Sequence, residues 1–69
     1  MDPAACLDLL TRALDEGDLG EATYLLGEYR RWRSRGGFEP QGGDARERDL
    51  RARLRNLLRQ RRQGGTKGD

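Results

Sequence analysis

Apolar and polar positions recur with helical spacing over three stretches of the chain, which are separated by breaks that contain glycine. The first stretch, residues 3–16, places its apolar side chains on one arc of about 160° of a helical wheel. These side chains are Cys6, Leu7, Leu9, Leu10, Ala13 and Leu14. Asp2 and Pro3 are typical of a helix start, because Asp caps free N–H groups and Pro suits the first turn. We therefore expect a helix over 3–16 that ends at Gly17.

The second stretch, residues 19–35, begins after Asp18, and Glu21 follows at the spacing of a capping box. One face of this predicted helix carries Leu19, Ala22, Leu25, Leu26, Tyr29 and Trp32. The short connection to the first stretch predicts an antiparallel helix hairpin over residues 1–35, with Tyr29 and Trp32 in its core. A stacking platform for nucleic-acid bases is the alternative for these two rings. Gly36 and Gly37 are expected to stop the helix.

Residues 36–43 form a predicted linker that is rich in Gly and contains Pro40. Phe38 is expected to fold back onto the hairpin. Asp44 is expected to cap a third, basic amphipathic helix within 44–63, spanning about 45–62, with a narrow stripe of Leu50, Leu54, Leu57 and Leu58. Residues 64–69 are expected to be a disordered tail. Because its leash is glycine-rich and its stripe is narrow, the third helix is expected to dock loosely or to swap onto a partner molecule.

The composition favours helices and excludes a sheet. Val and Ile are absent, and three Thr are the only β-branched residues. Hydrophobic residues make up 33% of the chain and charged residues 38%, which leaves little material for a core in 69 residues. The sequence predicts an all-α fold, a small three-helix bundle, and one that self-associates as a homo-oligomer because a single copy has so few apolar side chains.

Several kinds of chemistry lack their residues. The chain has no His and a single Cys, which excludes an intramolecular disulfide and a four-ligand zinc site. Ser34 is the only Ser and has no His to activate it. We therefore expect no enzyme activity, no cofactor and no metal. Two alternatives remain: a reactive Cys6 thiol near a helix start, and a hard cation at the acidic cluster Asp15, Glu16, Asp18 and Glu21. The same cluster is explained by helix capping and solvation, and it lacks the spacing of a calcium loop.

The sequence also predicts where the protein resides. The apolar runs are far shorter than the ~20 residues of a membrane span. The first apolar stretch carries Asp8 and Arg12, which argues against a signal peptide. We expect a cytoplasmic protein with no membrane span.

Charge is distributed unevenly along the chain, although the net charge is only +2. Residues 1–29 hold seven acids and one base, for a net charge of −6, whereas residues 44–63 hold eight Arg and three acids, for +5. Five arginines of the third helix fall within ~80° of one another over a length of about 21 Å. They are Arg48, Arg51, Arg55, Arg59 and Arg62, called here the Arg stripe. Three interpretations stay open: a solvated face that neutralises the acidic first helix, a phosphate-binding surface for nucleic acid, and a dock for an acidic protein or lipid surface.

A second polar group lies on the outer face of the second predicted helix. It consists of Tyr24, Glu28, Arg31 and Arg35, and an exposed Tyr beside Arg is a frequent composition of binding hot spots. The alternative is a solvated Tyr that stacks on Arg side chains of its own helix. The function expected from the sequence is a small, non-catalytic helical interaction or accessory module that docks on a protein partner or on itself. The alternative is a nucleic-acid-binding protein that uses the Arg stripe.

Overall fold

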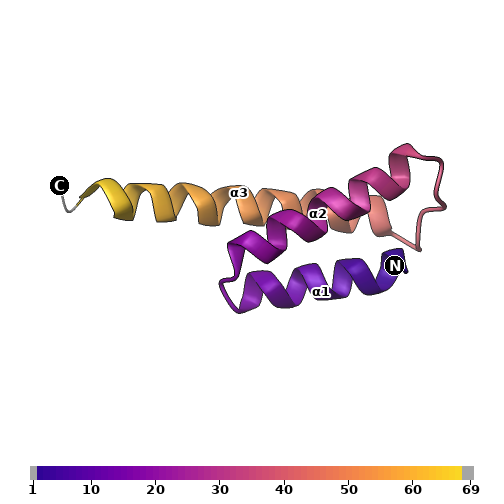
Figure 1. Cartoon of the computed structure of the whole chain (residues 1–69), viewed down its shortest axis with the longest axis horizontal. Helices are drawn as coiled ribbons and strands as arrows, with labels where there is room; N and C mark the ends of the chain where they lie inside the picture. The colour runs from indigo at the N-terminus through magenta and orange to yellow at the C-terminus, as the bar shows by residue number, and fades with distance from the viewer. Residues whose placement is uncertain (1, 68–69) are drawn as a thin grey trace.

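The computed structural model describes residues 2–67, with side chains described for residues 2–62. It consists of three helices. They are α1 (Pro3–Asp15), α2 (Leu19–Ser34) and α3 (Gly43–Lys67), and the predicted all-α three-helix bundle is confirmed. Figure 1 shows α1 and α2 as an antiparallel hairpin, with α3 running in the same direction as α1. The C-terminal half of α3 projects beyond the hairpin, and the molecule measures 46 × 19 × 17 Å along its principal axes.

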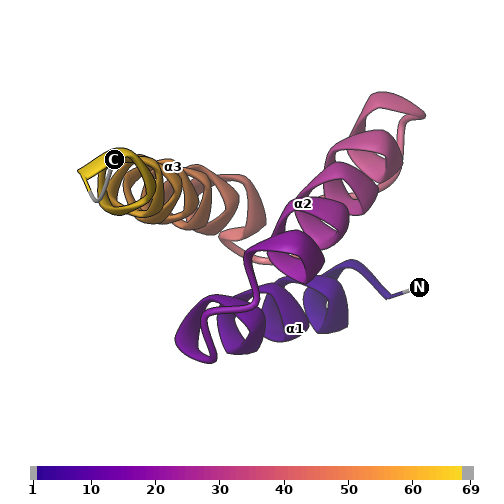
Figure 2. The same ribbon diagram turned by 60° about the vertical axis from the view of Figure 1, so that its left-hand side comes forward.

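The core lies where the apolar faces of all three helices meet. Its centre is Leu10 and Ala22, which are fully buried. The other buried hydrophobic side chains are Cys6, Leu7, Ala13, Leu14, Leu19, Leu25, Leu26, Tyr29, Leu50 and Leu54. Figure 2, in which α3 is seen nearly along its axis, shows this helix lying to one side of the hairpin. Because Leu50 and Leu54 are buried against the hairpin, the third helix is docked rather than free.

Leu9 departs from the prediction for the first helix. It belongs to the predicted apolar arc, but its side chain is 43% exposed. Leu9 sits at one edge of that arc, and the buried core of α1 is formed by the centre of the arc and by its other edge, where Leu7 lies. A wide apolar arc therefore leaves one large hydrophobic side chain in solvent.

The turn of the hairpin forms as the sequence predicts, whereas the start of α1 differs from the prediction. Gly17 adopts a positive φ of 76°, and the Asp18 carboxylate accepts a hydrogen bond from Glu21 N at 3.1 Å, so the predicted cap is confirmed. Gly36 ends α2 with φ of 88°. Asp2 occupies the N-cap position of α1, but its side chain makes no capping hydrogen bond. Asp2 contributes to the helix start through its backbone, because its carbonyl oxygen accepts a hydrogen bond from Cys6 N at 2.9 Å.

The start of α3 is held by side chains of α2, and the predicted role of Asp44 as the cap needs correction. Asp44 lies inside the first turn, where its carboxylate accepts bonds from Tyr29 Oη at 2.8 Å and from Arg33 Nε and Nη2 at 2.9 and 2.8 Å. Glu39 of the linker accepts the Asp44 N–H at 2.9 Å in its place. The bidentate guanidinium competes for the Asp44 oxygens more strongly than a backbone N–H does. We call Tyr29, Arg33 and Asp44 the α2–α3 latch.

Two ion pairs join α1 to α3 at matching positions. Arg46 Nη2 lies 2.8 Å from Asp8 Oδ1, and Arg53 Nη2 lies 2.7 Å from Asp15 Oδ1. The partners are spaced by two helical turns on both helices, which is possible because α1 and α3 run parallel. These pairs are exposed and contribute little energy, but they define the register of α3 along α1.

The linker packs on α2 at the surface rather than in the core. The Phe38 ring meets Trp32 edge to face, with centroids 5.6 Å apart, and the Trp32 indole N–H donates to Phe38 O at 2.9 Å. Phe38 is 63% exposed and Trp32 is half-buried. The expectation that Phe38 folds back holds, but the prediction that Trp32 is a core residue is wrong, because its ring covers Gly37 and leaves the hairpin interior to Tyr29.

The third helix is longer than its sequence suggests. It begins at Gly43 and continues to Lys67, whereas the sequence predicts about 45–62. Two consecutive glycines at 64–65 disfavour a helix without forbidding it, since glycine keeps the backbone N–H that proline lacks. Of the predicted tail, residues 64–67 continue the helix and residues 68–69 lie outside the described part of the chain.

Because Tyr29 is buried, the free energy of unfolding depends on pH in the alkaline range. Burial, together with the hydrogen bond to Asp44, raises the pKa of Tyr29 from 10.0 to about 12. Because the folded pKa is above the unfolded pKa, the contribution of Tyr29 to stability is complete below pH 10 and is lost as the pH rises to about 12.

We expect the free energy of unfolding to fall by about 1.4 kcal/mol per pH unit in this range. Urea titrations of the wild type and Tyr29→Phe will isolate this slope by difference. Tyr24→Phe, a change at an exposed ring, should keep it; equal slopes for the wild type and Tyr29→Phe would contradict the assignment.

Candidate interaction surface

The Arg stripe lies on the surface of α3 and takes no part in the bridges to α1. The two ion pairs between these helices use Arg46 and Arg53, which project from another side of α3. Arg51 Nε lies 3.7 Å from Glu47 Oε2 on the same helix. Within residues 2–62, no ion pair connects Arg48, Arg55 or Arg59 to an acid. The stripe therefore keeps most of its charge available to solvent or to a partner.

A groove runs between α2 and α3 beside the stripe. It has a volume of ≈ 450 Å³, with Leu26, Leu54 and Leu58 along its apolar floor. Its rim is formed by Arg30 of α2 and by Arg51, Arg55, Arg59 and Arg62 of α3. Leu26 and Leu54 are almost buried, but Leu58 is 39% exposed. We call this feature the Arg groove: an apolar floor between cationic edges.

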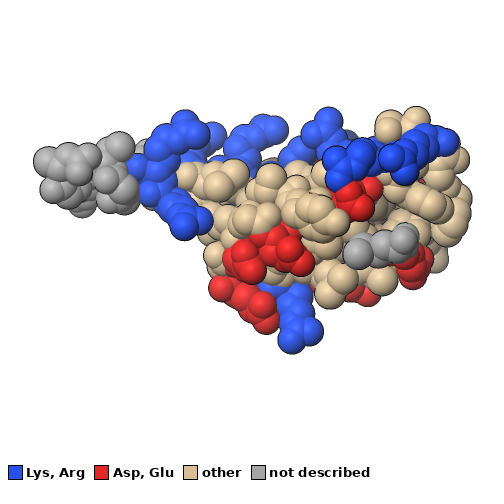
Figure 3. All heavy atoms as spheres, in the orientation of Figure 1, with Lys and Arg blue, Asp and Glu red and all other residues tan. Residues whose placement is uncertain are grey.

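The remaining charges are segregated from the groove. In Figure 3, basic side chains follow the upper edge of the molecule over α3 and the end of α2, and most acidic side chains lie below them. The acids of α1 closest to α3, Asp8 and Asp15, are paired with Arg46 and Arg53. A net charge of +2 thus conceals a strongly basic surface, which is the surface that an anionic partner meets first.

The polar group on α2 is also brought together by the helix. Glu28 and Arg31 form an ion pair, and this hydrogen bond holds the pKa of Glu28 below its ordinary value. The charge of Arg35 acts on Glu28 in the same direction. Tyr24 is 56% exposed, as predicted. Because Glu28 already occupies Arg31, this group offers less free charge than the Arg groove.

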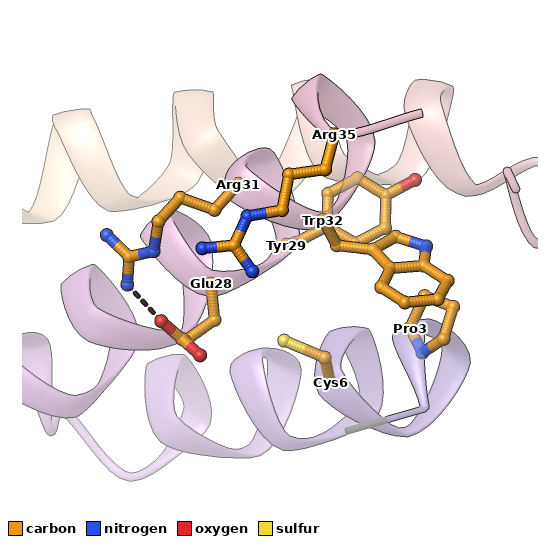
Figure 4. Close-up of a pocket in the computed structure, with 7 residues that line it drawn as sticks. All are labelled: Pro3, Cys6, Glu28, Tyr29, Arg31, Trp32 and Arg35. Atoms are coloured by element: carbon orange, nitrogen blue, oxygen red, sulfur yellow. Dashed lines mark hydrogen bonds and ion pairs between the residues drawn. The ribbon is translucent and has the colours of Figure 1, made fainter. Parts of the chain in front are cut away.

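A small pocket of ≈ 160 Å³ lies next to that polar group, between α1 and α2. Figure 4 shows its lining: Pro3, Cys6, Glu28, Tyr29, Arg31, Trp32 and Arg35. The Cys6 thiol is 2% exposed and donates to Leu25 O at 3.3 Å. Burial raises the pKa of the Cys6 thiol, which reduces its thiolate fraction and disfavours a reactive role.

The acidic residues at the hairpin turn are engaged in local contacts. Asp15 binds Arg53, Glu16 binds Arg12 at 3.2 Å, and Asp18 caps α2. No group of three or more metal-ligating side chains occurs among the residues that the structure describes. The capping interpretation of Asp18 accounts for this residue without a cation.

The α2 side of the groove was not predicted from the sequence. Leu26 and Arg30 come next to the Arg stripe only through the packing of α2 against α3. The sequence correctly assigns Leu26 to the core, but this assignment does not indicate that Arg30 lies on the rim of a groove. The cationic last turns of α2 are explained equally well by the helix dipole. In the sequence, the one indication that Arg30 borders a groove is its position beside the apolar face of α2.

Comparison of the chain with protein-family models, with curated proteins and with solved structures found no match. In the described part of the chain, no helix combines the length and the apolar character needed to cross a bilayer.

Proposed function

We propose that this protein is a small, non-catalytic interaction module that binds acidic polypeptide segments in the Arg groove between α2 and α3. The supporting observation is that the groove combines an apolar floor with Arg55 and Arg59, which form no ion pair within residues 2–62. An amphipathic helix with apolar anchors and acidic flanks complements both features, in the manner of helix-in-groove recognition.

The α2–α3 latch supports the same proposal by fixing the groove. Tyr29 and Arg33 hold Asp44 at the first turn of α3, so the two walls of the groove have a defined relative position. A preformed groove binds at lower entropic cost than one that must order on binding.

The test uses a defined probe, an amphipathic helical peptide with Leu at i, i+4 and i+7 and Glu on the flanking positions. We expect Arg55→Gln/Arg59→Gln to weaken binding by about tenfold, or about 1.4 kcal/mol, in fluorescence anisotropy titrations. Arg48→Gln/Arg61→Gln is the matched control, since it removes the same charge from α3 outside the groove. Equal losses in both variants, or equal binding of a peptide with Gln in place of Leu, would contradict recognition by the groove.

Nucleic-acid binding is the second candidate, favoured by the absence of an ion pair at Arg48, Arg55 and Arg59 among the described residues. No aromatic side chain lines the groove, so stacking of single-stranded bases is not supported and phosphate contacts would dominate. The same variants decide between the candidates on duplex DNA. Phosphate contacts by four stripe arginines predict a log–log salt slope of roughly −4, reduced by about two in Arg55→Gln/Arg59→Gln. Absence of DNA and RNA binding at ~50 mM salt would reject this candidate.

A further inference from the structure

A second surface on this chain has the opposite character to the Arg groove. It lies between α1 and the start of α2, in a shallow hollow of ≈ 250 Å³. Its lining residues are Leu9, Arg12, Ala13, Glu16, Asp18, Glu21 and Leu25. We call it the Leu9 surface, after the one large hydrophobic side chain that α1 leaves exposed.

The Leu9 surface combines one exposed apolar side chain with three carboxylates, of which Glu16 is paired with Arg12 on the same helix face. Leu9 and Glu16 are two turns apart and therefore share one side of α1. Glu21 of α2 and the N-cap residue Asp18 add two exposed carboxylates; Asp18 accepts the capping hydrogen bond from Glu21 N, and no ion pair engages either carboxylate within residues 2–62. An apolar anchor flanked by carboxylates is the complement of a groove with a Leu floor and Arg edges.

The two surfaces cannot meet within one molecule. The Leu9 surface lies between α1 and α2, the Arg groove lies between α2 and α3, and they have no lining residue in common. Contact between them therefore requires two copies. Because different patches of each copy would meet, the contact is heterologous, and repeating it builds open chains or, where the rotation closes, rings.

We propose that the Arg groove of one copy takes the Leu9 surface of a second copy, which builds head-to-tail assemblies. Leu9 enters the groove over the exposed Leu58, while Glu16 and Glu21 face the groove arginines. This inference rests on the proposed function, since it names the chain itself as an acidic partner of its own groove.

The test is a pair of variants that each disable one surface. Arg55→Glu/Arg59→Glu disables the groove and Glu16→Gln/Glu21→Gln disables the Leu9 surface; circular dichroism checks that both stay helical. By sedimentation velocity, the wild type should show a mass that rises with concentration at ~50 mM salt and returns to that of the 7.8 kDa monomer at ~500 mM salt, where charges are screened within a few Å. Each variant alone should remain a monomer. An equimolar mixture should give a 1:1 dimer and nothing larger, because only one working interface can form.

The outcomes separate this inference from the proposed function. A wild type that stays monomeric at ~50 mM salt while its groove binds the Leu/Glu peptide would overturn head-to-tail assembly and leave the groove function intact. Self-association that persists in both variants would also overturn it, since other surfaces would then be responsible. Arg61→Gln should associate as the wild type does, because this side chain lines neither surface.

Discussion

Replacing Leu54 by Ala is expected to lower the free energy of unfolding by about 2–4 kcal/mol, because it removes a buried side chain where α3 meets the hairpin. Leu54 is 5% exposed and, with Leu50, is one of two buried hydrophobic side chains that α3 contributes to the core over residues 43–62. A chain of 69 residues with so small a core has little stability to spare. The loss will be visible in urea titrations and as an earlier melting transition.

Leu58→Ala is the matched control for this experiment. It removes the same atoms one turn further along α3, but Leu58 is 39% exposed and borders the groove. We expect a loss below about 1 kcal/mol, in keeping with surface positions. If the two substitutions cost the same, α3 is not docked through Leu54, and the groove does not have the floor described above.

Gly43→Ala is expected to destabilise the protein by roughly 1–3 kcal/mol through overpacking at the α2–α3 latch. A Cβ at this position would lie 2.6 Å from Pro40 Cγ and 2.7 Å from Tyr29 Oη. The Tyr29 ring is buried and its hydroxyl binds Asp44, so it cannot move aside without breaking the latch. Thermal melts of the variant will measure the loss.

Gly27→Ala is expected to have the opposite sign. Gly27 lies inside α2, and the nearest atom to an added Cβ is the flexible Arg31 guanidinium at 3.9 Å. Replacing a helical glycine in open space stabilises by about 0.5–1 kcal/mol, since the unfolded chain loses freedom. A stabilising Gly43→Ala would show that the start of α3 is loose and that the latch does not fix the groove.

The helices could be predicted from the sequence because each carries its own signals. Leu spacing, Asp18 and the glycine stops at Gly17 and Gly36 are local features, and they act within a few residues of where they stand. The register between helices is not local. Asp44 has the sequence of a cap, yet Tyr29 and Arg33 bind its carboxylate once α3 folds back.

For the same reason, only part of the candidate site could be predicted from the sequence. The Arg stripe follows from the period of one helix, so its residues could be named in advance. The groove needs the second wall that Arg30 and Leu26 provide, and it needs the knowledge that Arg46 and Arg53, rather than the stripe, bind the acids of α1. Leu9 shows the converse: a helical wheel assigns it to the apolar face, and only the position of α3 decides that this edge faces solvent.

The two ion pairs between α1 and α3 determine where the chain tolerates a change in length. Asp8 and Asp15 match Arg46 and Arg53 because both spacings are seven residues. One residue inserted between Arg46 and Arg53 would rotate the rest of α3 by about 100°. Arg53 would then turn from Asp15, and Leu54 would leave the core. Residues added beyond Leu58 would rotate neither, so these ion pairs and the burial of Leu54 would be kept, whereas Arg59 and Arg62 would leave the rim of the groove.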